Sequence, residues 1–341
     1  MSVIPSPYLI YLGDTPMAAL AKTGAGLAYW RPERCLAQLR EPGCAADLGL
    51  PDMTLAEAAA KGAKTLVIGT SAPGGQLPNS WVTRLVEAIE EGMDLASGLH
   101  MPLRAIPAID AAATRTGRQI HDVRLSGGPH PIATGLPRSG HRLLTVGTDC
   151  AVGKKYAALA IHKALEARGI PATFRATGQT GVLIDGHGLA IDAIVSDFLA
   201  GAVETLTPAA SDEHWDIVEG QGSIVHPAYA GVTLGLLHGA QPDAFVVCHE
   251  AGREELIGFP GHKTGRIEQV ISLITDLGRV VSPKIRCVGI SLNTSRLEEG
   301  AARAALSDLS DQYGVPACDP VRFGVSKIID LLEISHHSVG G

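Results

Sequence analysis

The chain has 341 residues, about twice the ~150 residues of a typical domain, so two domains with separate cores are expected. Hydrophobic residues make up 45% and charged residues 18%, a balance that excludes the disordered and fibrous classes. A net charge of −7 and a pI near 6.0 exclude a global positive field for nucleic acid or anionic lipid. We therefore expect a small-molecule substrate, with neither nucleic acid nor a membrane as partner.

Six cysteines are scattered along the chain without any C-x-x-C pair, which argues against a zinc ribbon or a disulfide framework and favours reduced thiols. The first residues lack a basic segment followed by a long apolar one, and no stretch approaches the ~18 apolar residues of a membrane helix. The expected compartment is the cytoplasm, and the expected assembly is a homo-oligomer.

The N-terminal part alternates short apolar runs with helical patterns. Residues 8–12 and 65–69 predict strands, and the second of these leads into the Gly/Pro-rich loop SAPGGQLP at 71–78. An amphipathic helical pattern follows within 81–100, and residues 122–125 are a further strand candidate. A strand, a loop and a helix in this order are the unit of a parallel α/β sheet.

The segment SGGPHPIATGLPRSG is dense in Gly, Pro and Ser, so we place the domain boundary near residues 126–140 and the two domains at 1–135 and 136–341. The second domain begins with a strand at 142–146, a loop, and a helix at 154–168. Its further strand candidates are 172–176, 215–218, 244–248 and 286–292, and its further helix candidates are about 192–203, 266–277, 298–313 and 326–333. Strands separated by helices predict a mostly parallel sheet that is covered on both faces.

The strongest motif is GTDCAVGKK, which lies directly between an apolar strand and a helix, as a phosphate-binding P-loop does. In such a loop, backbone N–H groups surround an anion, the helix N-terminus adds its positive dipole end, and a lysine supplies a mobile cation. The candidate cofactor-binding residues are Gly147, Thr148, Cys150, Ala151, Val152, Gly153, Lys154 and Lys155.

Lys155 departs from the usual P-loop pattern. The position after the P-loop lysine normally carries Ser or Thr as a magnesium ligand, whereas Lys155 cannot coordinate a cation and adds a second positive charge. Ordinary NTP hydrolysis is therefore not favoured. A loop with two lysines can hold the phosphates of coenzyme A without a metal.

A second cluster is WDIVEGQGSIVHPAYAG, in which a strand leads to Glu219 and then to a glycine-rich turn with Gln221 and His226. Ligands of open α/β sheets collect at the carboxyl ends of strands, so Glu219 is predicted to be either a metal ligand or a general base. Cys150 would have a lowered thiol pKa at a helix N-terminus, but no histidine adjoins it in sequence, so we place it with the cofactor-binding residues.

Two further segments carry candidate substrate-binding residues. RATGQT offers Arg175, Thr177 and Gln179 at the end of a strand, where arginine and neutral donors could bind a carboxylate. CHEAGR offers His249 and Arg253 after another strand, although an ordinary charged loop explains this segment equally well.

The motifs GTDCAVGK, RATGQTGVLIDG, AIDAIVSDFLAGAVE, VEGQGSIVHPAYAGVTLGLLHGAQPD and CHEAGR together resemble the DgcN-type family of D-glutamate N-acetyltransferases, long catalogued as a domain of unknown function. In the N-terminal part the resemblance is carried by IGTSAPGGQLPNSW. The resemblance implies a Rossmann-like N-terminal domain and a P-loop domain similar to dethiobiotin synthetase. The GTDT-x-VGKT loop of that enzyme ends in a threonine where this chain has Lys155.

The resemblance also implies a function: transfer of the acetyl group of acetyl-CoA to the amine of D-glutamate, with no metal required. Under this hypothesis the P-loop holds the cofactor phosphates, and Glu219 or His226 takes the amine proton. The candidate catalytic residues are Glu219, His226 and Asp149, and the candidate substrate-binding residues are Arg175, Thr177, Gln179, Gln221, His249 and Arg253.

Two alternatives remain open at the level of sequence. The first is an ATP- and magnesium-dependent ligase or carboxylase of the dethiobiotin synthetase type, in which Asp149 and Glu219 hold the metal in place of the missing hydroxyl. The second is a module that senses a nucleotide or coenzyme A without catalysis.

Overall fold

The computed structural model describes residues 4–71, 77–125 and 129–337, so residues 72–76 of the predicted loop and 126–128 of the predicted boundary lie outside the described residues. The chain forms two compact units. The first comprises Met1–Gly127 and Gln179–Ala193, and the second comprises Gly128–Gly178 and Ile194–Gly341. The short segment 179–193 thus leaves the second unit and returns to the first.

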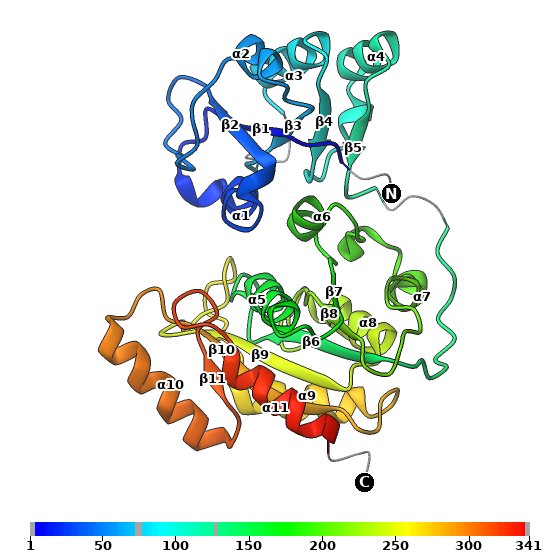
Figure 1. The fold of residues 1–341 in the computed structure, drawn as a ribbon, viewed down its shortest axis with the longest axis vertical. Helices are drawn as coiled ribbons and strands as arrows, with labels where there is room; N and C mark the ends of the chain where they lie inside the picture. Colours follow the sequence, from blue (N-terminus) through cyan, green and yellow to red (C-terminus); the bar gives the residue numbers. More distant parts are fainter. Residues whose placement is uncertain (1–3, 72–76, 126–128, 338–341) are drawn as a thin grey trace. The chain divides into compact units, whose positions relative to one another are not determined.

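The first unit is built on a five-stranded parallel sheet with the order β2-β1-β3-β4-β5. Its strands are β1 Tyr8–Gly13, β2 Cys35–Arg40, β3 Thr65–Ile68, β4 Asp94–Ser97 and β5 Ile120–Asp122. Figure 1 shows the helices α2 (Leu55–Ala60), α3 (Asn79–Glu90) and α4 (Pro107–Thr116) along one face of this sheet, and α1 (Lys22–Trp30) on the other. There α1 packs against α6 (Gln179–Asp185).

Two predictions for this unit are wrong in detail. The helical pattern within 81–100 is a helix only as far as Glu90, because Gly92 adopts φ +86° and turns the chain into the buried strand β4. The strand expected at 122–125 is β5, which ends at Asp122. In the first case an apolar stretch fits a helix and a strand equally well, and pairing within the sheet decides between them. In the second case the type of element is right, and the strand begins two residues earlier than expected.

The second unit is built on a six-stranded parallel sheet with the order β11-β10-β9-β6-β8-β7. Its strands are β6 His141–Gly147, β7 Ala172–Arg175, β8 Trp215–Val218, β9 Ala244–Glu250, β10 Arg286–Asn293 and β11 Ala317–Cys318. Every strand predicted for the C-terminal half is present, and the central strands are almost wholly buried, as expected for a sheet covered on both faces. The two sheets confirm the predicted α/β class.

The helices of the second unit are α5 Lys154–Ala167, α7 Ser196–Leu206, α8 Ala230–Ala240, α9 Ile267–Gly278, α10 Glu299–Tyr313 and α11 Ser326–His337 (Figure 1). The helix expected at 192–203 is two elements, a 3-10 turn at Ile191–Ala193 and α7, and α8 was not predicted. Within the described part of the chain, no helix has both the length and the apolar character needed to cross a bilayer.

Candidate active site

The P-loop connects the end of β6 to the start of α5, as the motif predicts. Gly153 precedes the helix with φ +105°, a conformation that favours glycine, and Ala151 adopts φ +54°, which costs a residue with a β-carbon about 1–2 kcal/mol. No described side chain caps α5 at Gly153. The first N–H groups of α5 are therefore available to an anion, and strain of this kind is typical of ligand sites.

Lys154 is buried and its side chain turns back into the loop, where Nζ donates to the carbonyl oxygen of Asp149 at 2.8 Å. Burial lowers the pKa of the Lys154 ammonium, because removal from water outweighs the attraction of neighbouring negative groups. Gly220 packs beside it, and a β-carbon at Gly220 would lie 1.6 Å from the carbonyl oxygen of Thr145 and 3.0 Å from Lys154 Cδ. The lysine is thus held inside the loop, in a position to meet a phosphate.

Asp149 is fully buried and both of its carboxylate oxygens accept hydrogen bonds. Oδ1 accepts from the backbone N–H of Cys150 at 2.6 Å, and Oδ2 accepts from Arg253 Nη1 at 3.0 Å and from the N–H of Ile257 at 2.9 Å. Arg253 Nη1 also donates to the carbonyl oxygen of Cys150 at 2.8 Å, and its Nη2 pairs with Glu250. The pair of Asp149 and Arg253 therefore fixes the P-loop.

Glu219 follows directly after β8 and is 3% exposed. Its Oε2 accepts from the backbone N–H groups of Thr177 at 3.1 Å and Gly178 at 3.2 Å. Burial raises the pKa of Glu219 to about 7, against the opposing effects of Lys155, the two N–H groups and Lys154. A carboxylate with this pKa can exchange a proton near neutral pH, which is the property that a general base requires.

Thr177 and Gln221 adjoin this carboxylate. The hydroxyl of Thr177 donates to the carbonyl oxygen of Glu219, and Gln221 Nε2 donates to the same hydroxyl at 3.3 Å. These two predicted substrate-binding residues therefore lie in one network with the predicted base.

His226 is buried, with its ring 4.6 Å from the rings of both Tyr229 and Phe259. Its Nδ1 accepts from the backbone N–H of Ala228 at 3.1 Å, so in the neutral ring the proton is on Nε2. Burial lowers the pKa of His226, which favours this neutral form. Nε2 lies 3.9 Å from Asp149 Oδ1 and has no hydrogen-bond partner among the described residues. The geometry thus makes His226 a donor, whereas a base would need a free lone pair.

Asp149, Cys150 and His226 could each offer a ligand atom to a metal, and these atoms lie within 4.8 Å of one another. The donor set does not fit a cation, however. Both oxygens of Asp149 are taken by donors, Nε2 of His226 carries its proton, and burial raises the thiol pKa of Cys150, which keeps the thiol protonated. The nearby cations of Lys154 and Arg253 add repulsion.

The remaining predicted substrate-binding residues are dispersed. His249 Nδ1 lies 2.8 Å from Thr148 Oγ1, which ties the histidine to the P-loop, and burial lowers its pKa. Arg175 instead pairs with the buried Asp216, with 2.6 Å between Nε and Oδ1. Gln179 belongs to the first unit, as the first residue of α6.

Sequence reasoning missed a pocket of about 270 Å³ beside the P-loop. It is lined by Ala151, Gly153 and Tyr156, by Asn293 at the end of β10, and by residues that follow β11, among them Pro320. Ligands of parallel sheets bind at the carboxyl ends of strands, and this was the available signal. The strand at 286–292 was predicted, whereas β11 has only two residues and was not. A lining that combines apolar side chains with the amide of Asn293 suits a heterocyclic base, since both apolar contacts and edge hydrogen bonds can be made.

Comparison with known proteins gives full-length matches. Residues 131–329 match a family described as a domain of unknown function, DUF1611_C P-loop domain, and residues 39–126 match the DUF1611_N Rossmann-like domain. A relative from Tritonibacter scottomollicae, named D-glutamate N-acetyltransferase, is 48% identical over 330 residues, which are 97% of this chain and 99% of the relative. A second protein of the same name, from a Pseudoalteromonas species, is 43% identical over 326 residues, 96% of this chain and 98% of its own.

A solved structure is also similar throughout. The crystal structure of a DUF1611 family protein from Anabaena variabilis superposes with a TM-score of 0.86 at 34% identity, covering 96% of this chain and 99% of that one. The predicted Rossmann-like and P-loop architecture and the predicted family are thereby confirmed. The chain belongs to the DUF1611 family, with a Rossmann-like N-terminal and a P-loop C-terminal domain.

Proposed function

We propose that this protein is an N-acetyltransferase that transfers the acetyl group of acetyl-CoA to the amine of D-glutamate. The observation that carries the proposal is Glu219, a buried carboxylate whose pKa is raised to about 7, beside a P-loop with Lys155 where the hydroxyl ligand of magnesium usually stands. The names of two relatives, at 48% and 43% identity over nearly their full length, support the same activity.

The cofactor part of the proposal rests on the P-loop and the neighbouring pocket. Coenzyme A carries phosphates next to an adenine base. The N-terminus of α5 and the ammonium of Lys154 offer an anion site, and the pocket of about 270 Å³ beside Ala151 and Asn293 has room for the base. Since the donor set around Asp149 does not fit a metal ion, the phosphates are bound without one.

Glu219 is the proposed general base. It takes a proton from the ammonium group of the amino acid, and the freed amine attacks the carbonyl carbon of the thioester. A C–N bond forms and the C–S bond breaks, and the leaving thiolate of coenzyme A takes up the second proton that the attacking nitrogen loses as it becomes an amide. The Nε2–H group of His226 has no described partner and is the proposed donor to the carbonyl oxygen as negative charge develops on it.

Arg175 and Arg253 are not retained as clamps for the substrate carboxylates, because both pair with buried carboxylates. Gln221 takes this part in the proposal through its second Nε2–H, and Thr177 positions that amide, because the Thr177 hydroxyl proton is already donated to the carbonyl oxygen of Glu219. His249 remains a candidate through its contact with Thr148.

The test is an assay of free thiol release from acetyl-CoA. Thiol should appear with D-glutamate, less or none with L-glutamate, and the rate should be unchanged by EDTA. A product that forms only with Mg-ATP would replace this proposal with the ligase alternative. Binding of acetyl-CoA without turnover on any D-amino acid would favour a sensing module.

A further inference from the structure

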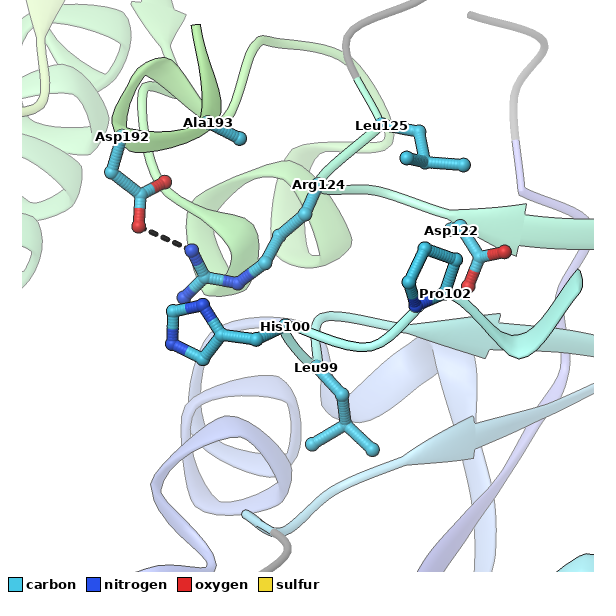
Figure 2. Close-up of a pocket in the computed structure, with 8 residues that line it drawn as sticks. All are labelled: Leu99, His100, Pro102, Asp122, Arg124, Leu125, Asp192 and Ala193. Atoms are coloured by element: carbon cyan, nitrogen blue, oxygen red, sulfur yellow. Dashed lines mark hydrogen bonds and ion pairs between the residues drawn. The ribbon is translucent and has the colours of Figure 1, made fainter. Parts of the chain in front are cut away.

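A pocket in the first unit lies at the carboxyl ends of β4 and β5 (Figure 2). Its volume is about 270 Å³, just below the range of roughly 300–1,000 Å³ that is typical of sites for drug-sized ligands. Leu99 and His100 reach it from the segment after β4, and Arg124 from the segment after β5. In parallel α/β sheets this edge is where ligands bind, although this pocket plays no part in the acetyl transfer proposed above.

Arg124 is the central cation of the pocket. Its side chain is 12% exposed and is fixed by two contacts: Nε donates to the carbonyl oxygen of Gly98 at 2.8 Å, and Nη1 pairs with Asp192. Figure 2 shows the guanidinium reaching across to Asp192, which the segment 179–193 brings back to this unit. A guanidinium has five N–H groups, so three remain without a partner among the described residues.

The pocket also carries negative charge. Asp192 is 35% exposed, and one of its carboxylate oxygens pairs with Arg124 while the other is available. Asp122 is occupied differently, because its oxygens accept from the backbone N–H groups of Leu103 at 2.8 Å and Arg104 at 3.3 Å. A cation and an anion are thus both presented to the same small space.

Leu99, Pro102 and Leu125 supply the apolar part of the pocket lining (Figure 2). A phosphate, or a dicarboxylate without an ammonium group, would meet the two aspartates as well as the arginine, and a simple cation would meet Arg124. Neither satisfies both signs of charge. A small molecule with a carboxylate, an ammonium group and a short carbon chain does.

We propose that this pocket is a binding site for an α-amino acid, with the carboxylate held by Arg124 and His100 and the ammonium held by Asp192. The site lies within the first unit and does not rest on the acetyl transfer reaction. A protein that binds an amino acid here without acetylating it would still bear out this proposal.

The test compares two probes on the full-length protein without acetyl-CoA: D-glutamate, and glutarate, which has the same carbon chain but no ammonium group. Two observables are used. Titration of the imidazole NMR signal of His100, identified by its loss in His100→Ala, gives the affinity at this pocket, and calorimetry gives the total binding, which includes any binding at the site of acetyl transfer. D-Glutamate should shift this signal and bind about tenfold or more tightly than glutarate, since one charge-assisted contact is worth at least this factor. Asp192→Asn should weaken the binding of D-glutamate by a similar factor and leave the binding of glutarate nearly unchanged.

His187→Ala is the matched control, because His187 is an exposed histidine of the same unit outside the pocket. The His187→Ala variant should bind D-glutamate and glutarate with the affinities of the wild type. His100→Ala removes a side chain exposed at the pocket edge, so the variant should fold normally and bind both D-glutamate and glutarate more weakly. The proposal is overturned if saturating D-glutamate leaves the His100 signal in place, or if glutarate binds as tightly as D-glutamate.

Discussion

The loops that follow β6 and β8 begin at the same edge of the second sheet. Each loop carries a buried carboxylate, and the surroundings of the two carboxylates differ. Asp149 accepts from three donors, one of them the guanidinium of Arg253. Oε2 of Glu219 accepts two backbone hydrogen bonds, and burial raises the pKa of Glu219 to about 7. Position at a strand end therefore does not decide the role of a carboxylate, since the donors around it do.

His226 connects the two loops. It follows β8 in sequence, yet its Nε2–H lies 3.9 Å from Asp149 in the P-loop. The β6 loop is accordingly interpreted as a rigid anion site and the β8 loop as the source of the proton-transfer group. The predictions below test this division of roles.

The largest effect is expected for Glu219→Gln, which keeps the shape of the side chain and removes its charge. The kcat for thiol release should fall by about 10²–10⁴-fold, the usual contribution of positioned proton transfer. The Kd for acetyl-CoA, measured by calorimetry, should hardly change. Near-normal kcat in a folded Glu219→Gln protein would exclude Glu219 as the base.

Asp149→Asn is the matched control, because it changes the other buried carboxylate of this sheet edge. It leaves Arg253 with a weaker partner, so the expected result is a lower Tm and weaker binding of acetyl-CoA. If instead Asp149→Asn lowers kcat as far as Glu219→Gln does, with Tm and Kd unchanged, the division of roles between the loops is wrong.

The next effect concerns His226 and separates a donor from a base. His226→Gln keeps an N–H donor near the position of Nε2, whereas His226→Leu removes it. If His226 donates to the developing oxyanion, the leucine variant should lose about 10²-fold in kcat and the glutamine variant should retain most of it. Equal loss of activity in both variants would restore His226 as the base.

Lys154→Ala should mainly affect binding. It removes the buried cation whose side chain turns back into the P-loop, and a charge-assisted contact of this kind corresponds to roughly a ten- to hundredfold increase in the Kd for acetyl-CoA. Calorimetry on the folded variant measures this directly. Lys64→Ala, in the first unit, is the control that removes a lysine without touching the loop, and an equal change in both variants would contradict the P-loop assignment.

The sequence predicted the P-loop and the strands of the second unit because both depend on short-range patterns: an apolar run, a glycine-rich turn and a helix start. It did not predict contacts between distant residues. Arg175 pairs with Asp216 on the neighbouring strand, and the tautomer of His226 is set by one backbone N–H at Ala228. Hydrogen-bond geometry of this kind depends on the packed structure and leaves no periodic signal.

The smallest effect is expected on stability, where the raised pKa of Glu219 gives a dependence with a definite sign. Its pKa rises from 4.5 to about 7 on folding, so between these values the folded protein binds the proton more tightly than the unfolded chain. The contribution of protonated Glu219 to the free energy of unfolding is therefore fully present below about pH 4.5 and is lost as the pH rises through about 7. Glutamine stays neutral at every pH.

The Tm of Glu219→Gln minus the Tm of the wild type should accordingly increase from pH 5 to pH 8, by roughly a few degrees. Thermal unfolding at pH 5, 6, 7 and 8 measures this difference. A difference that stays constant with pH would mean that Glu219 ionises as an ordinary carboxylate, and the physical reason for choosing it as the base would be gone.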